Sequence, residues 1–155
     1  MDRLSNTVAD GFIHSYRDFA RRVRALSEKL SDEQFWTKPY PYGNSFGHLT
    51  LHITGNLNYY IGAQIANTGY VRDRESEFTE ESRPSKDEVL GRLYEAVELV
   101  VATLEAQTAE DWSKQYEAAE AADFVKDRFS IFLRCAAHFH HHVGQMIYLE
   151  KELSK

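Results

Sequence analysis

Residues 125–153, VKDRFSIFLRCAAHFHHHVGQMIYLEKEL, combine a helical apolar pattern with four of the seven histidines of the chain. On an α-helix, residues four positions apart leave the same face, about 6 Å from each other along the axis. His138 and His142 have this spacing and share their direction with Ile131 and Leu149. The stretch therefore predicts one long amphipathic helix whose apolar face presents two imidazoles.

Three further segments show the same helical period. In the first, from Leu4 to Leu30, a large apolar residue recurs every three or four positions. The second runs from about residue 45 to 66, with Asn44 or Ser45 as the N-cap, and presents Phe46, Leu49, Ile53, Leu57, Tyr60 and Ile61 to the core. The third follows Pro84, where Ser85 and Glu88 are spaced for a capping box.

The connection between the second and third helices is long and polar: NTGYVRDRESEFTEESRPS, residues 67–85. Strand signals are absent, so the sequence predicts an all-α four-helix bundle with a long crossover between its second and third helices. No shift in composition suggests a second domain, and 155 residues with 43% hydrophobic content are enough for one core. We expect a single domain over residues 1–155.

Charge and cysteine content narrow the class of protein. The formal net charge is −6 at pH 7 and no basic face is evident, so we expect no nucleic acid partner. No apolar run approaches the roughly 20 residues that a bilayer span needs, and MDRLSNTVADGF lacks the apolar core of a secretory signal. The sole cysteine, Cys135, cannot form an internal disulfide, and a cytoplasmic protein without a membrane partner is expected.

The paired histidines favour a metal site. A single histidine on an apolar stripe is usually a core residue with one hydrogen bond. Two on one turn are different, because unpaired buried imidazole nitrogens cost about 1–3 kcal/mol each and a shared cation satisfies them together. His140 and His141 point in other directions, and His14 lies opposite the first apolar stripe, so all three are interpreted as structural or solvent-facing.

A third ligand is expected from the second helix, where His48 and His52 repeat the four-residue spacing. His52, nearer the helix centre, is the preferred ligand. His48 is interpreted as a hydrogen-bond donor beside the site or a partly exposed residue, with a fourth ligand as the other reading. Three imidazoles suit a divalent transition metal, with zinc or nickel expected, and leave a coordination position open.

Other polar residues near these histidines have two readings each. Asn56 and Gln145 could orient a ligand or substrate, or simply join helices by hydrogen bonds. Cys135, one turn before His138, is more typical of a small buried side chain than of a ligand. The loop residues Arg72, Asp73, Arg74 and Glu77 would recognise an anionic substrate only if the loop folds back over the histidines, and would otherwise be solvated surface.

Three motifs together resemble a known family: LHITGNLNYYIG at 51–62, RDRESEF at 72–78 and HFHHHVGQMIYL at 138–149. They are similar to the DinB-like, or DinB/YfiT-like, metal-binding four-helix bundles, in particular to an uncharacterised branch with a final HxxxHxGQ motif. The resemblance spans nearly the whole chain. It implies an up-down-down-up helix order, a divalent ion held by His52, His138 and His142, and a homodimer. The branch commonly has Asn where this chain has His48, so the coordination number stays open.

Some relatives in that family are thiol S-transferases or a mycothiol-dependent isomerase, in which the metal activates the thiolate of a low-molecular-weight thiol. The resemblance therefore implies a metal-dependent transferase that adds such a thiol to a small electrophilic substrate. The first alternative is a non-catalytic, metal-binding structural or stress-associated protein. A second alternative is a dimeric interaction module that depends little on metal. Fold membership alone does not decide between them, because function resides in the site.

Overall fold

The structure, a computed structural model, describes residues 2–155 and consists of helices joined by loops. The long helical segments are α1 (Arg3–Ser27), α3 (Phe46–Leu57) with its π-helical continuation η1 (Asn58–Ala63), α5 (Lys86–Glu105) and α6 (Arg128–Leu153). The connections contain the short helices α2 (Asp32–Phe35) and α4 (Ser76–Thr79) and the 3₁₀ turn η2 (Asp111–Ser113). An isolated bridge between Gln115 and Asp127 is the sole β-type pairing over residues 2–155, so the prediction of an all-α protein is confirmed.

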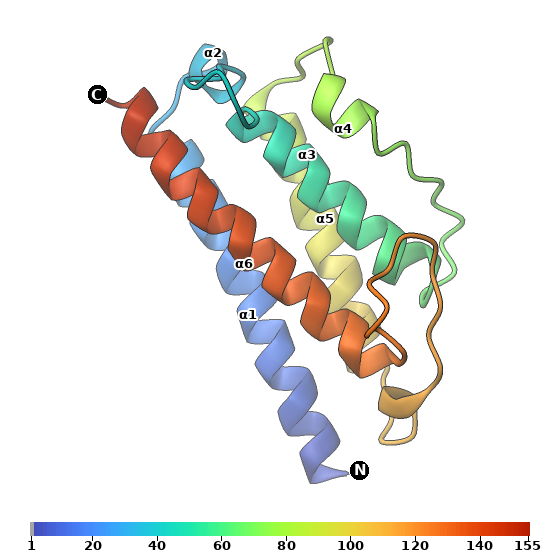
Figure 1. Cartoon of the computed structure of the whole chain (residues 1–155). Coiled ribbons are helices and arrows are strands. Elements are labelled where there is room, and N and C mark those ends of the chain that lie inside the picture. Colours follow the sequence, from blue (N-terminus) through green and yellow to red (C-terminus); the bar gives the residue numbers. More distant parts are fainter. Residues whose placement is uncertain (1) are drawn as a thin grey trace.

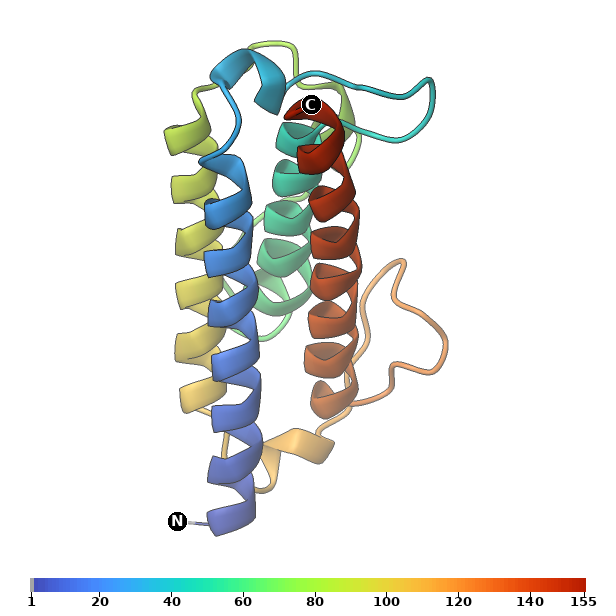
Figure 2. The same cartoon turned by 90° about the vertical axis from the view of Figure 1, so that its left-hand side faces the viewer.

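The long helices pack side by side (Figure 1). Helix α1 contacts α5 and α6, and α3 contacts the same two helices from the other side. In Figure 2 the chain ascends in α1 and α6 and descends in α3 and α5. The connection from η1 to α5 runs back along the outside of α3 and carries α4, which contacts α3 (Figure 1). This long connection therefore lies against the helix that contains His52.

Side-chain caps set where the helices begin. Ser45 accepts a hydrogen bond from the backbone N–H of His48 at 3.0 Å, and Ser85 accepts one from Glu88 at 3.2 Å, as predicted for these N-caps. The second half of the predicted capping box is wrong, because the Glu88 carboxylate accepts a hydrogen bond from Arg92 instead, at 2.7 Å. Helix α6 begins at Arg128, later than predicted, because Asp127 is its N-cap and accepts from the N–H of Ser130.

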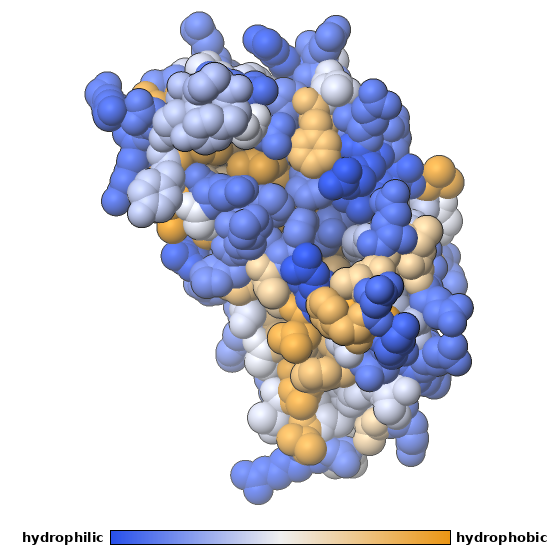
Figure 3. All heavy atoms as spheres, in the orientation of Figure 1, coloured by the Kyte–Doolittle hydropathy of each residue, from blue (hydrophilic) through white to orange (hydrophobic). Residues whose placement is uncertain are grey.

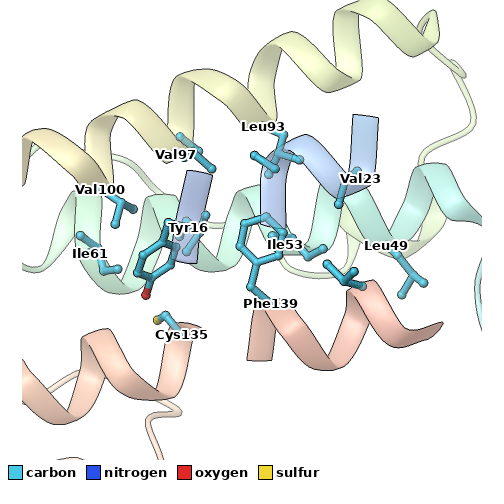
Figure 4. Packing of buried hydrophobic residues seen from close by; sticks show 14 of the residues in the cluster. Tyr16, Val23, Leu49, Ile53, Ile61, Leu93, Val97, Val100, Cys135 and Phe139 are labelled. Atoms are coloured by element: carbon cyan, nitrogen blue, oxygen red, sulfur yellow. The ribbon is translucent and has the colours of Figure 1, made fainter. Parts of the chain in front are cut away.

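The core lies between the four long helices, and Figure 4 shows aliphatic and aromatic side chains from α1, α3, α5 and α6 meeting there. The predicted apolar face of α1 is partly wrong. Leu4 is 72% exposed, whereas Ala9, Ile13 and Ala20 are buried. Small alanines let α1 approach its neighbours closely, and the helix turns that face inward. Tyr16 is fully buried and its hydroxyl donates to the backbone oxygen of Phe132 at 2.7 Å.

The surface is mixed in character. In Figure 3, apolar side chains gather over the lower half of the visible face, where the N-terminal parts of α1 and α6 lie. Large exposed apolar residues from this region include Leu4, Phe129 and Leu133. Within residues 2–155, none of the helices has the length and apolar content that crossing a membrane would need.

Candidate metal centre

The three histidines predicted as ligands come together between α3 and α6. His138 Nε2 lies 2.9 Å from His52 Nε2 and 3.1 Å from His142 Nε2. The potential ligand atoms all lie within 4.8 Å of one another, a spacing that one metal ion can bridge. The predicted convergence of two helices on one histidine cluster is therefore what the structure contains, and ligation of a metal by the cluster stays a prediction. We call His52, His138 and His142 the histidine trio.

Hydrogen bonds at the far side of two rings fix which nitrogen faces the centre. His52 Nδ1 lies 2.9 Å from a carboxylate oxygen of Glu77, and His142 Nδ1 lies 2.7 Å from the side-chain oxygen of Gln145. A carboxylate or amide oxygen only accepts, so both Nδ1 atoms carry the proton and donate. Both Nε2 atoms then present lone pairs to the centre, as neutral metal-binding imidazoles do.

The trio has more hydrogen-bond acceptors than its ring protons can satisfy. With lone pairs on Nε2 of His52 and His142, His138 can donate its single ring proton to at most one of them at short distance. Its Nδ1 is buried and has no hydrogen-bond partner among the described residues. A cation between the three Nε2 atoms would satisfy all three lone pairs at once, so the donor set fits a transition metal.

Burial keeps two rings of the trio, those of His138 and His142, in the neutral form. Removal from water lowers the pKa of His138 to about 3, and repulsion from the neighbouring histidines acts in the same direction. Burial also lowers the pKa of His142 to about 4, although the hydrogen bond to Gln145 opposes the shift. Both rings are therefore neutral at pH 7 and do not need to lose a proton before they bind a metal.

The crossover contributes a residue that the sequence analysis did not assign to the centre. Glu77, in α4, is buried and contacts both His52 and Arg72. Arg72 donates from Nε at 2.8 Å and from Nη2 at 2.9 Å to the two carboxylate oxygens. Burial would raise the pKa of the Glu77 carboxyl, but the hydrogen bonds from His52 and Arg72 hold it below its ordinary value. Glu77 therefore stays ionised and orients His52.

Gly55 makes room for this carboxylate. An ideal Cβ at position 55 would lie 1.9 Å from Glu77 Oε2 and 2.6 Å from its Cδ. No side chain larger than hydrogen fits beside Glu77 in this position. The glycine of the LHITGN motif thus has a structural reason that local pattern alone does not reveal.

The remaining histidines and the cysteine lie outside the trio. The ring of His48 has partners at both nitrogens: Ser45 Oγ at 2.7 Å and the backbone oxygen of Glu80 at 3.2 Å. His140 stacks on Phe19, and His141 is exposed. Cys135 is buried, and burial raises the pKa of its thiol to about 12. These positions agree with the readings of His48 as a hydrogen-bonding residue and of Cys135 as a packing residue.

Two cavities adjoin the trio. The first, which we call the arginine cavity, has a volume of about 440 Å³ and is bordered by His52, His138, Arg72, Arg74 and Arg134. Its wall also includes Asn56 and Tyr60, the latter from the π-helical turn η1. Such turns are frequent at functional sites because they redirect side chains within a helix. The loop therefore folds back beside the histidines, the condition on which its predicted substrate-binding role depended.

The second cavity, also of about 440 Å³, is bordered by His142. We call it the tyrosine cavity, because Tyr40, Tyr42 and Tyr148 border it together with Gln145. The rings of Tyr40 and Tyr42 stack with their centroids 5.3 Å apart. His52 and His138 thus border a polar, cationic cavity, and His142 borders an aromatic one.

Comparison with known proteins agrees with the all-helical fold. None of the curated proteins compared with the chain matches it. A family model described as the DinB superfamily matches residues 16–146, which contain all three histidines of the trio and the Glu77 that orients one of them. Because this match covers most of the sequence, the chain belongs to the DinB superfamily.

Proposed function

We propose that the histidine trio holds a divalent transition metal, zinc or nickel, and that the protein is a metal-dependent thiol S-transferase. The observation that carries the proposal is the approach of three Nε2 atoms, at 2.9 and 3.1 Å, with two of the three rings oriented by hydrogen bonds at Nδ1. When bound, such an ion supplies a Lewis acid that lowers the pKa of a thiol or water brought to it.

The thiol is proposed to come from a substrate rather than from the chain. Cys135 borders the arginine cavity, but with a pKa of about 12 its thiol stays protonated at pH 7. In the proposed reaction, the sulfur of a small thiol forms a bond to an electrophilic carbon and the thiol proton is released. The electron pair of the broken bond leaves with the leaving group. A transfer between two substrates needs two spaces beside one centre, and the arginine and tyrosine cavities supply them.

The residues around the trio would position these substrates. Glu77 and Gln145 hold His52 and His142 in the orientation that presents Nε2. Asn56 and Tyr60 border the arginine cavity and offer polar groups to its occupant. Phe78 packs against the ring of His52 at 4.8 Å between centroids and shields that side of the centre from water.

A second function is supported by the origin of the three histidines. They come from α3 and α6, so an ion held by them would also fasten these helices together. This supports the alternative of a non-catalytic structural or stress-associated metal protein. The two cavities beside the trio favour the enzyme, because structural metal sites are usually closed by a fourth protein ligand.

The remaining features of the proposal concern the protein as a whole. We propose one DinB-like domain over residues 1–155 in the up-down-down-up order, which the helix directions in Figure 2 support. The exposed apolar residues Leu4, Phe129 and Leu133 support a homodimer. A single unpaired cysteine fits the reducing cytoplasm, which is the proposed location.

Metal analysis combined with thiol-conjugation assays tests the function. Wild type and His141→Ala should each contain about one metal ion per chain, and His142→Ala should not, because only His142 belongs to the trio. Turnover of a small thiol with an electrophile should require the metal and disappear in His142→Ala. Stoichiometric metal without turnover for any thiol would favour the structural alternative, and wild type that binds no metal and keeps its melting temperature after chelation would favour the interaction module.

A further inference from the structure

The arginine cavity carries an excess of positive charge. Arg72 is neutralised by Glu77, but Arg74 and Arg134 have no carboxylate within 4.0 Å among residues 2–155. The one carboxylate on the cavity wall is that of Glu120. Two free guanidinium groups against one carboxylate leave a charge of +1, in a chain whose formal net charge is −6. The charge of this wall is opposite in sign to the net charge of the chain, and it favours an anionic occupant.

A buried acceptor on the same wall points to a ligand with a hydrogen-bond donor. Asn56 is 7% exposed, and its side-chain oxygen has no hydrogen-bond donor among the described residues. Leaving such a group unsatisfied costs about 1–3 kcal/mol, so buried amide oxygens nearly always have a partner. Asn56 borders the arginine cavity, so a rotation of its amide group would bring this oxygen to an N–H or O–H group of the occupant.

Guanidinium groups recognise carboxylates by paired N–H···O bonds, and the two free arginines come from different parts of the fold. Arg74 belongs to the crossover and Arg134 to α6, so an anion between them would join these two elements. Arg74 also lies over the ring of Phe78, with 5.4 Å between its guanidinium carbon and the ring centroid. Phe78 in turn packs on the ring of His52, so Arg74 contacts the histidine trio through Phe78.

We propose that the arginine cavity binds a small carboxylate that also carries an N–H or O–H donor. Its carboxylate lies between Arg74 and Arg134, its donor reaches the side-chain oxygen of Asn56, and the rest of the molecule faces His52 and His138. The volume of about 440 Å³ fits a molecule of this size. The inference rests on the proposed function, because it assigns a chemical class to one of the two substrates.

Binding of an unreactive probe tests this assignment without turnover. N-acetylmethionine offers a carboxylate and an amide N–H but no thiol, and N-acetylmethioninamide is its neutral counterpart. We expect metal-loaded wild type to bind the acid at least tenfold more tightly than the amide in an NMR-detected titration. Affinity for the acid should fall as salt is added, since charge attraction is screened.

Matched variants locate the binding. Arg134→Gln and Arg74→Gln should each weaken binding of the acid by about tenfold. Arg22→Gln makes the same charge change at an exposed position of α1 and should weaken binding by less than twofold. Asn56→Leu should weaken binding severalfold without lowering the urea midpoint, because it removes an unsatisfied buried oxygen. The assignment is overturned if the amide binds as well as the acid, or if the cavity arginine variants behave like Arg22→Gln.

The same titration on chelator-treated protein separates this inference from the proposed function. Selective binding of the acid that depends on Arg74 and Arg134, in a protein that conjugates no thiol, would uphold the carboxylate site and reject the transferase. Metal content and conjugation that survive in Arg134→Gln, with no acid selectivity in wild type, would uphold the transferase and reject the carboxylate site.

Discussion

Gly55→Ala should destabilise the protein and weaken its metal site, although alanine normally stabilises a helix. Position 55 lies within α3, where alanine is favoured over glycine by about 0.5–1 kcal/mol. The added methyl group would lie 1.9 Å from Glu77 Oε2, so the two cannot coexist. The backbone of α3 is held by its helix hydrogen bonds, whereas Glu77 is a flexible side chain. Glu77 therefore has to move.

The cost follows from what Glu77 loses. It gives up one hydrogen bond from His52 and two from Arg72, at 2.9, 2.8 and 2.9 Å. Breaking a buried ion pair costs about 3–5 kcal/mol when the partner stays buried. Since alanine returns about 1 kcal/mol of helix propensity, the net loss of unfolding free energy is about 2–4 kcal/mol. Without its carboxylate partner, His52 should also lose orientation, which typically weakens metal binding by about 10–100-fold.

Urea unfolding followed by circular dichroism measures the stability, and competition with a chromophoric chelator measures zinc affinity. Gly91→Ala is the matched control, because Gly91 lies in α5 and its Cβ would meet nothing within 4 Å. This control should gain about 0.5–1 kcal/mol and keep its zinc affinity. In a Glu77→Ala background, Gly55→Ala should likewise become neutral or stabilising, because the clash is gone. A single Gly55→Ala variant that matches Gly91→Ala in both measurements would refute this account of Glu77.

Four further outcomes are expected. Zinc at about 100 times its dissociation constant should add about 2.7 kcal/mol to the free energy of unfolding, which is roughly 5–10 °C in melting temperature. This gain is expected for wild type and His141→Ala but not for His142→Ala. An equal shift in all three proteins would show that the ion binds elsewhere. With a pKa of about 12, Cys135 is a thiolate to about one part in 10⁴ at pH 8, so a thiol reagent should label folded protein at least ~100-fold more slowly than urea-unfolded protein. Because this pKa is raised by folding, the contribution of Cys135 to stability is present below about pH 9 and declines as the pH rises toward 12. Ser45→Ala should cost about 1 kcal/mol by removing the cap of α3 and should leave metal content unchanged, whereas loss of metal would show that His48 takes part in coordination.

Local sequence pattern was sufficient for the helices and for placing two of the three histidines of the trio on one face. Period and caps predicted four long helices, and the four-residue spacing alone placed His138 and His142 on one face. The choice of His52 over His48 as a ligand depended on its position near the helix centre and stays a prediction. In the structure His52 lies in the histidine cluster, whereas the ring of His48 is held by Ser45 and Glu80 at the helix start.

Packing between segments far apart in the sequence determined the structural features that the local pattern did not predict. The stripe of large residues on α1 pointed to Leu4, but the buried face carries Ala9 and Ala20, whose small size matters only once a neighbouring helix is present. Glu77 lies in a polar connection with no periodicity, and its burial depends on a glycine in another helix. No local sequence pattern in either segment predicts that contact. The π-helical turn that brings Tyr60 to the cavity wall is equally hidden in an ordinary helical pattern.

Charge balance links the trio to the occupant proposed for the arginine cavity. The ion pair of Arg72 and Glu77 is neutral as a unit, and three neutral imidazoles contribute no charge. The positive charge of a divalent ion would therefore be uncompensated by its protein ligands, beside a wall that already carries a positive excess from Arg74 and Arg134. A site built only to fasten two helices gains nothing from this excess, since it raises the cost of holding a cation there. The excess is useful if an anionic molecule arrives to neutralise it, which favours substrate binding as the reason for the arrangement.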